Sequence, residues 1–134
     1  MRFQQDELLA LLRRLVAVRS YPGAEAAAQQ VVAEWLAAAG LAPELQPTAN
    51  GQPNVLARVE NGPGPALLLN GHIDTVLAVE GWAADPWQGW VEGQRLRGLG
   101  AADMKCGVAV NMLVARELAR RRAEWRGTLI FSCV

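Results

Sequence analysis

The sequence is poor in several features that would point to particular classes of protein. Its 134 residues contain only two cysteines, Cys106 and Cys133, too few for a disulfide framework and not spaced as a Cys-x-x-Cys pair. We expect both thiols to be reduced and buried. No apolar run reaches the roughly 20 residues that a membrane-spanning helix needs. Thirteen basic residues balance thirteen acidic ones, so no basic field favours a nucleic acid or a membrane surface as a partner.

The N-terminal stretch also lacks the features of a secretory leader. Its apolar part, residues 8–12, is shorter than a signal-peptide core, and Arg13 and Arg14 follow it where a small-residue cleavage site would be needed. We therefore expect the chain to stay in the cytoplasm. The length suits one domain, and a hydrophobic content of 51% with 19% charged residues is typical of a globular chain.

The spacing of apolar residues predicts an alternation of helices and strands. A helical period predicts helices over residues 6–19, 24–39 and 103–122. Alternating or continuous apolar residues predict strands over residues 54–60, 66–69 and 127–134, a short edge strand within 43–52 and a hairpin over 90–96.

This order predicts an α/β fold, a three-layer αβα sandwich with a mixed, largely parallel sheet. The strands 54–60 and 66–69 are expected to be neighbours, and the apolar run 66–69 is expected to be covered on both faces. The sheet is expected to be incomplete at the C-terminus, since a buried strand there ends the chain. Leu129, Ile130 and Phe131 would then lie near an uncovered edge and favour self-association.

His72, the only histidine, directly follows the apolar strand 66–69. Active sites of open α/β sheets form at such carboxyl ends, and an extended backbone places His72 and Asp74 on the same side. An imidazole is a common zinc ligand, and a neighbouring carboxylate can hold the ring in place. Alternatively, His72 is a half-buried structural histidine and Asp74 forms a turn, which is the commoner outcome for an isolated His-x-Asp.

A second acidic residue, Asp103, ends the long loop 78–100 at the start of the third predicted helix. Alone it would be a good helix N-cap. Loops of this length tend to be functional, so its three tryptophans either line a substrate entrance or hold the loop by packing: Trp82, Trp87 and Trp90. Lys105 is expected to be a surface residue, with a weak contact to a substrate carboxylate as the alternative. The arginines near the end of that helix are expected to form a solvated terminus rather than a binding patch: Arg116, Arg120, Arg121, Arg122 and Arg126.

Residues 68–112, with the motifs Gly71–Val76 and Gly98–Lys105, resemble the zinc-dependent aminoacylase and carboxypeptidase superfamily. This superfamily includes acetylornithine deacetylase, succinyl-diaminopimelate desuccinylase and the glutamate carboxypeptidases. The resemblance implies a zinc-peptidase-like fold and a metal-dependent hydrolase that cleaves amide bonds of N-acyl amino acids or small peptides. It also implies two Zn²⁺ ions in a complete site, with cobalt as a substitute.

The resemblance further implies roles for three residues. His72 would bind one zinc ion, Asp74 would act in catalysis by orienting that imidazole, and Asp103 would bridge the two ions. The peptide bond after Asp103 would be cis. Two positions depart from the family pattern, because Leu99 stands where an arginine is usual and Cys106 where a glycine is usual.

The resemblance covers only the first part of such an enzyme. A glutamate pair, a further acidic ligand, a second histidine and a dimerisation domain would follow the last strand. Residues 1–134 are therefore expected to be the N-terminal part of a di-zinc catalytic domain, inactive alone, that needs a second copy or the missing C-terminal half as a partner. Two alternatives stay open: a non-catalytic module with weak single-metal binding, and a remnant that cannot fold.

Overall fold

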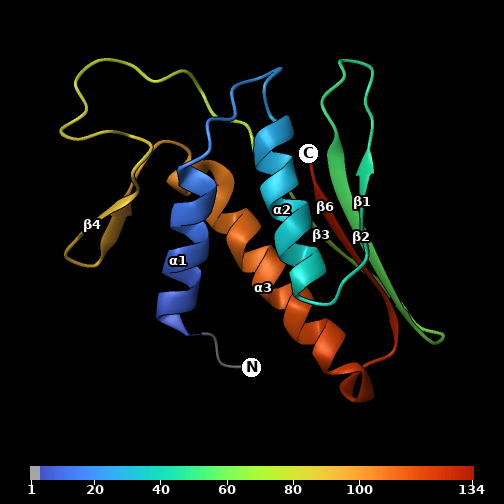
Figure 1. The fold of residues 1–134 in the computed structure, drawn as a ribbon. Helices are drawn as coiled ribbons and strands as arrows, with labels where there is room; N and C mark the ends of the chain where they lie inside the picture. Colours follow the sequence, from blue (N-terminus) through green and yellow to red (C-terminus); the bar gives the residue numbers. More distant parts are fainter. Residues whose placement is uncertain (1–3) are drawn as a thin grey trace.

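A layer of three helices lies on one side of a four-stranded sheet in the computed structural model, which describes residues 4–134 (Figure 1). The second and third helices pack on the sheet, and the first packs against these two helices. The first three residues of the N-terminal stretch discussed above lie outside the described part. No helix in residues 4–134 has the length and apolar character needed to cross a bilayer. The α/β class and the mixed sheet are confirmed. The third layer of the expected sandwich is not found among these residues, since Arg58 and Glu60 on the opposite face of the sheet are exposed.

The three predicted helices are present and somewhat shorter than expected: α1 (Gln5–Val16), α2 (Ala26–Ala38) and α3 (Cys106–Arg120). Each buries the apolar stripe that predicted it; in α1 this stripe includes Leu12 and Leu15. Helix α2 ends before Gly40, whose positive φ of 87° suits a helix terminus. Helix α3 starts three residues later than predicted because the backbone of Asp103 and Met104 is not helical.

The strand order of the sheet is β1-β2-β6-β3. Its members are β1 (Pro43–Gln46), β2 (Asn54–Asn61), β3 (Ala66–Gly71) and β6 (Gly127–Cys133). Strands β2 and β3 are not neighbours, contrary to the prediction, because β6 lies between them. Strand β6 pairs parallel with β3 and antiparallel with β2, and β1 pairs antiparallel with β2. The sheet is thus mixed, with one parallel pair in these strands, rather than largely parallel.

Strand β3 lies at the edge of the sheet, which corrects two expectations about exposure. Its Leu67 and Leu68 are 49% and 58% exposed, so the run is not covered on both faces. Strand β6 is an interior strand, and its Leu129 and Phe131 are buried beneath the helices. The uncovered apolar edge therefore belongs to β3 and not to the terminal strand.

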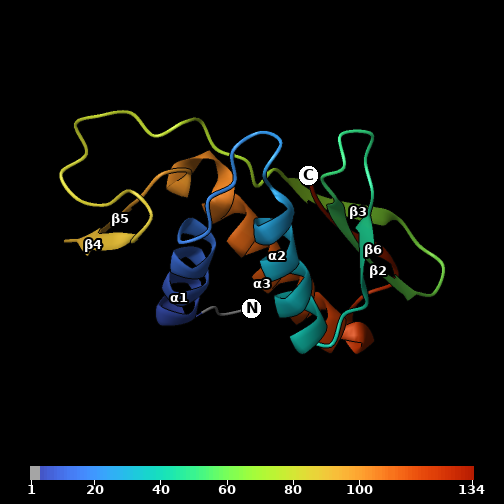
Figure 2. The ribbon, with the colours of Figure 1, turned by 45° about the horizontal axis from the view of Figure 1, so that its top comes forward.

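The predicted hairpin is confirmed and lies apart from the sheet. Strands β4 (Trp90–Glu92) and β5 (Arg95–Arg97) pair antiparallel. Figures 1 and 2 show the hairpin beyond α1, on the side of the helices away from the sheet. The long loop thus carries its tryptophans across the end of the helical layer.

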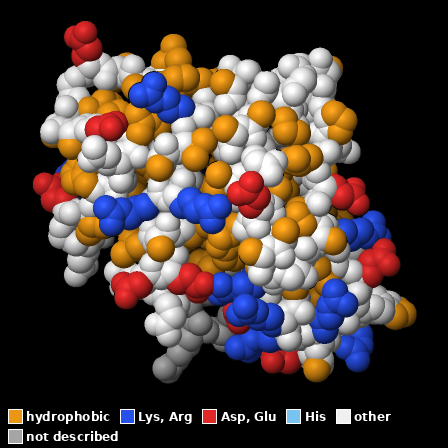
Figure 3. Space-filling model, viewed as in Figure 1, with side chains coloured by type: hydrophobic (Ala, Val, Ile, Leu, Met, Phe, Trp, Pro, Cys, Tyr) orange, Lys and Arg blue, Asp and Glu red, His pale blue; other side chains and the backbone are white. Residues whose placement is uncertain are grey.

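The arginines of α3 divide into exposed and buried residues. Positive and negative side chains are mixed on the face drawn in Figure 3, and Arg121 pairs with Glu117 and Glu124, in agreement with a solvated terminus. Arg116 differs, because its side chain is only 11% exposed. Its guanidinium donates to both carboxylate oxygens of Glu7 in α1, with 2.9 Å between Nη2 and Oε2. Arg116 is therefore a contact between two helices.

Glu7→Gln is expected to lower the free energy of unfolding by about 1 kcal/mol at pH 7, because it removes a two-point ion pair that is only partly open to solvent. Arg116 holds the pKa of Glu7 below its ordinary value of 4.5. The pair therefore stabilises the fold above pH 4.5, and its contribution is lost as the pH falls through the lowered pKa. Urea unfolding of both chains across this range measures the difference. Glu34→Gln, which breaks the exposed pair with Arg14 at 3.6 Å, is the matched control and should change stability by less than about 0.5 kcal/mol.

Candidate metal centre

The segment after β3 holds His72 and Asp74 at the carboxyl edge of the sheet. Ile73 donates its N–H to the carbonyl of Val134 at 2.8 Å, and Thr75 donates to the carbonyl of Ser20 at 2.8 Å. The Ser20 hydroxyl donates to the Ile73 carbonyl at 2.7 Å. Because this backbone is extended and Ile73 is fully buried, the side chains on either side of it face outward.

The imidazole of His72 lies between two carboxylates. Its Nδ1 is 2.8 Å from Oδ1 of Asp74, and its Nε2 is 3.1 Å from Oδ1 of Asp103. The structure thus brings the three predicted residues together, with Asp74 behind the ring and Asp103 in front. The convergence of His72 and Asp103 expected from the sequence is present.

This arrangement is chemically suited to a cation. A neutral imidazole has one N–H, so it can donate to only one of the two carboxylates. If Nδ1–H donates to Asp74, the Nε2 lone pair and a carboxylate oxygen of Asp103 face the same space. Either a second proton or a metal ion is then needed between them, and nitrogen and carboxylate oxygen are both zinc donors. The residues present therefore fit part of a zinc site.

Asp103 reaches this position through an unusual turn in residues Ala101–Lys105. The backbone of Asp103 is extended, with φ −130° and ψ 98°, and the Asp103–Met104 peptide bond is cis, as the resemblance implies. Helix α3 has no side-chain N-cap bond, so the N-cap alternative for Asp103 is wrong. Gly100 precedes the turn with φ 73°, and a Cβ there would lie 2.3 Å from the Thr75 side chain. A glycine is needed for the turn to approach this closely.

The site is incomplete within the described residues. His72 supplies one nitrogen and Asp103 one carboxylate, and residues 4–134 contain no group of three or more His, Cys, Asp or Glu side chains able to hold a metal ion. Structural and catalytic zinc sites use three or four protein ligands. The two donors would therefore bind a metal ion weakly unless other ligands join them.

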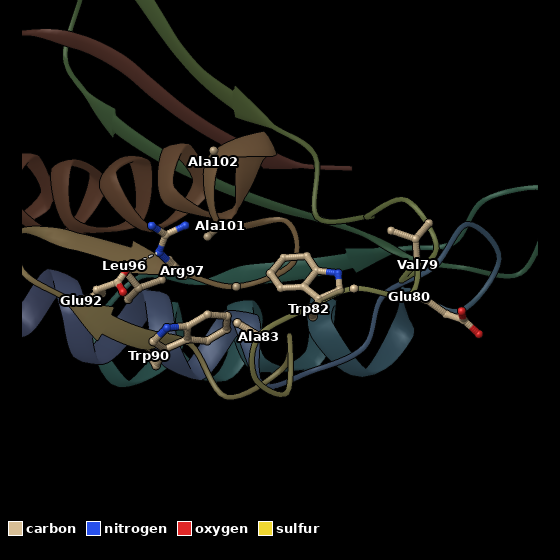
Figure 4. A pocket seen from close by; sticks show the side chains of 12 residues that line it. Val79, Glu80, Trp82, Ala83, Trp90, Glu92, Leu96, Arg97, Ala101 and Ala102 are labelled. Atoms are coloured by element: carbon tan, nitrogen blue, oxygen red, sulfur yellow. Dashed lines mark hydrogen bonds and ion pairs between the residues drawn. The ribbon is translucent and has the colours of Figure 1, made fainter.

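A cavity adjoins the site. A pocket of about 260 Å³ contains His72, Asp74 and Asp103 in its walls. It shares four lining residues with a larger cavity of about 710 Å³: Trp82, Gly98, Ala101 and Ala102. Figure 4 shows the indoles of Trp82 and Trp90 in this larger cavity, with Arg97 beside them and paired with Glu92. The two spaces together could hold a small molecule next to His72.

The tryptophans of the long loop divide between packing and lining a cavity. Trp87 is buried and packs edge-on against Tyr21, with ring centroids 5.6 Å apart, so it holds the loop against the helical layer. Trp82 and Trp90 pack edge-on against each other at 6.1 Å and line the cavity.

Lys105 was expected at the surface, and the structure places it in the interior. Its side chain is fully buried, and Nζ donates to the carbonyls of Leu15 at 2.9 Å and Val18 at 2.8 Å. Burial lowers its pKa to about 8. A signal was present in the sequence, because Lys105 precedes Val108 and Ala109 by three and four positions and so falls on the apolar stripe of the third predicted helix.

The two cysteines are free. Cys133 is buried, as expected, and burial raises its pKa to about 12. Cys106 is only partly buried at the start of α3. The expectation of burial therefore holds for Cys133 and not for Cys106. Neither sulfur joins His72 or Asp103 in a metal-binding group.

Comparison with known proteins gives consistent matches. A family model described as peptidase family M20/M25/M40 matches residues 68–134. Succinyl-diaminopimelate desuccinylase of Gluconobacter oxydans is 41% identical over 114 residues, which cover 82% of this chain and 30% of that protein. Acetylornithine deacetylase of Edwardsiella ictaluri is 39% identical over 115 residues, which cover 78% of this chain and 30% of that protein. The chain thus spans about a third of the length of the curated relatives it matches.

Solved structures match over nearly the whole chain. Human carnosine dipeptidase 1 superposes with a TM-score of 0.77 at 24% identity. The matched region covers 96% of this chain and 31% of the dipeptidase chain. The Bacillus subtilis YXEP protein, described as a dinuclear metal binding peptidase, superposes with a TM-score of 0.69 at 21% identity. The matched region covers 96% of this chain and 34% of the YXEP chain. These two likenesses concern the fold.

Proposed function

Because the chain belongs to peptidase family M20/M25/M40, we propose that it forms the N-terminal part of the catalytic domain of a metal-dependent hydrolase. The bonds cleaved are amide bonds of N-acyl amino acids or small peptides, as the names of the desuccinylase and deacetylase relatives suggest. The observation that carries the proposal is the imidazole of His72 between two carboxylates, in the wall of a pocket that adjoins a larger cavity.

Each residue of the centre has a distinct role in this proposal. His72 Nε2 and the Asp103 carboxylate would hold divalent metal, zinc by preference and cobalt as a substitute, and Asp103 would be shared between two ions in a complete site. The likeness to a dinuclear metal binding peptidase supports this number. Such ions polarise the amide carbonyl and lower the pKa of bound water when they are present.

Asp74 acts through His72. By accepting a hydrogen bond from Nδ1–H, with 2.8 Å between Nδ1 and Oδ1, it fixes the ring orientation and leaves the Nε2 lone pair directed at the space beside Asp103. A carboxylate behind a ligating histidine also makes the imidazole more basic. The apolar wall of the cavity, with Trp82 and Trp90, receives the substrate and excludes water from one side of it.

A second candidate function is a non-catalytic module that keeps the fold and binds one metal ion weakly. The presence of only two donors among the described residues favours this alternative. The two functions differ in metal stoichiometry and in whether the chain can complete an active site with other segments.

Complementation tests the proposal directly. The 134-residue chain is mixed with the part of the G. oxydans desuccinylase that follows the region it matches, and release of succinate from N-succinyl amino acids is measured with Zn²⁺ or Co²⁺. The exposed edge strand β3, with Leu67 and Leu68, offers a surface on which the added segment can pair. We expect metal-dependent hydrolysis by the mixture and none with Asp103→Ala. A stable complex that binds two ions without hydrolysis would contradict the proposal.

A further inference from the structure

Lys105, the only lysine of the chain, is buried in a way that needs an explanation. Burying an ammonium group is costly unless it is paired or hydrogen-bonded. No carboxylate pairs with Lys105 among the salt bridges of residues 4–134. Its partners are the carbonyls of Leu15 and Val18, and its Nζ lies 5.8 Å from the centroid of the Trp87 ring.

These partners place the ammonium at one end of a helix. Leu15 lies in the last turn of α1, and Val18 follows its end. Helix C-termini carry a partial negative charge and leave carbonyls without intrahelical partners. Lys105 satisfies two carbonyls there, so the side chain links α1 to the segment that precedes α3.

Asp103 depends on this segment for its position. Its carboxylate side chain is 86% exposed, and within residues 4–134 its only side-chain hydrogen bond or ion pair is with His72. Two backbone bonds close the turn: the N–H of Lys105 donates to the carbonyl of Gly100 at 3.0 Å, and the N–H of Cys106 donates to the carbonyl of Ala101. The side chain of Lys105, two residues after Asp103, attaches this turn to the end of α1.

We propose that Lys105 is a positioning residue for the candidate metal centre: its bonds to the end of α1 hold residues 101–105 so that the Asp103 carboxylate faces Nε2 of His72. The part of this inference that concerns metal affinity rests on the proposed function. Lys105 touches neither the cavity beside the site nor His72, so it acts only through the backbone that carries Asp103.

The test compares Lys105→Met, which keeps an unbranched side chain of nearly the same length and removes the ammonium, with Leu36→Ala. Leu36 is equally buried, in α2, and serves as a matched control for loss of stability. We expect Lys105→Met to lower the affinity for Zn²⁺, measured by calorimetry on the full chain, by tenfold to a hundredfold, the range typical of residues that support a ligand. Leu36→Ala should change it by less than twofold. Equal affinity in all three chains, or an equal loss in both variants, would overturn the proposal.

A metal-free measurement separates this inference from the proposed function. The ¹⁵N chemical shift of His72 Nε2 reports its contact with Asp103 whether or not the chain binds zinc. We expect Lys105→Met, but not Leu36→Ala, to shift this signal toward its value in Asp103→Ala; an unchanged shift would contradict the positioning role. If Lys105→Met does not fold, Lys105→Arg replaces it, since arginine keeps a buried cation. The His72 signal of Lys105→Arg should keep its native chemical shift. A shift equal to that of Asp103→Ala would contradict the positioning role of Lys105. Absence of zinc binding by the native chain with these shifts intact would instead count against the proposed function.

Discussion

His72→Ala is expected to lower the affinity of the chain for Zn²⁺ by at least about a hundredfold, the upper end of the range for loss of a supporting residue, because here a direct ligand is lost. The chain has no second histidine to replace it. Only the carboxylates of Asp103 and Asp74 would remain at the site, and no nitrogen ligand. Calorimetric titration with Zn²⁺, and the visible spectrum of the Co²⁺ form, measure the loss.

Two further variants show whether the loss reflects the site. Asp74→Asn keeps the shape of the side chain and should lower affinity by about tenfold to a hundredfold, since it alters the group that orients the ring. Glu44→Gln changes an exposed carboxylate on β1 and should leave affinity unchanged. If His72→Ala binds zinc as tightly as the native chain, the assignment of the metal centre is wrong.

The relation between His72 and Asp74 could be predicted from the residues because it is local. Both follow one strand, and the period of two in extended backbone places them together wherever that strand lies in the sheet. The approach of Asp103 is not local, since a long loop separates it from His72. Only the family resemblance indicated that contact, and the backbone turn at Asp103 that makes it possible has no signature in apolar spacing.

Strand order and edge position could not be predicted for the same reason. Apolar content shows that a strand such as 66–69 is suited to burial, but the neighbour of each strand depends on how the chain crosses the sheet. Here the connection through α3 inserts β6 between β2 and β3, which leaves Leu67 and Leu68 on the edge. The pattern of residues along one strand does not show which strand will pair with it.

The errors at Lys105 and Arg116 share a different cause. Charged side chains are mostly exposed, so both were expected at the surface. Lys105 precedes α3 directly and Arg116 lies within it, and both side chains are stabilised by specific acceptors: backbone carbonyls for Lys105 and a carboxylate for Arg116. A charged residue on an apolar helical stripe is better interpreted as a buried contact whose partner is still to be found.

The isolated chain is expected to hydrolyse N-acetyl and N-succinyl amino acids no faster than buffer containing the same concentration of Zn²⁺ or Co²⁺. Two donors do not hold a pair of metal ions, so polarisation by two ions is lost. A general base, which contributes typically 10²–10⁴-fold, is also missing from the described site. Asp74 is bonded to His72 and Asp103 faces the metal position, and no other carboxylate lines the smaller pocket.

The decisive measurement is the release of free amine by the purified chain at saturating metal, compared with His72→Ala prepared in the same way. A trace of a contaminating host hydrolase would give equal rates in both preparations. Metal-dependent turnover that His72→Ala abolishes would contradict the prediction, because the site would then have recruited its missing ligands and base from another copy of the chain. A rate that also rose with the square of chain concentration would identify that second copy as their source.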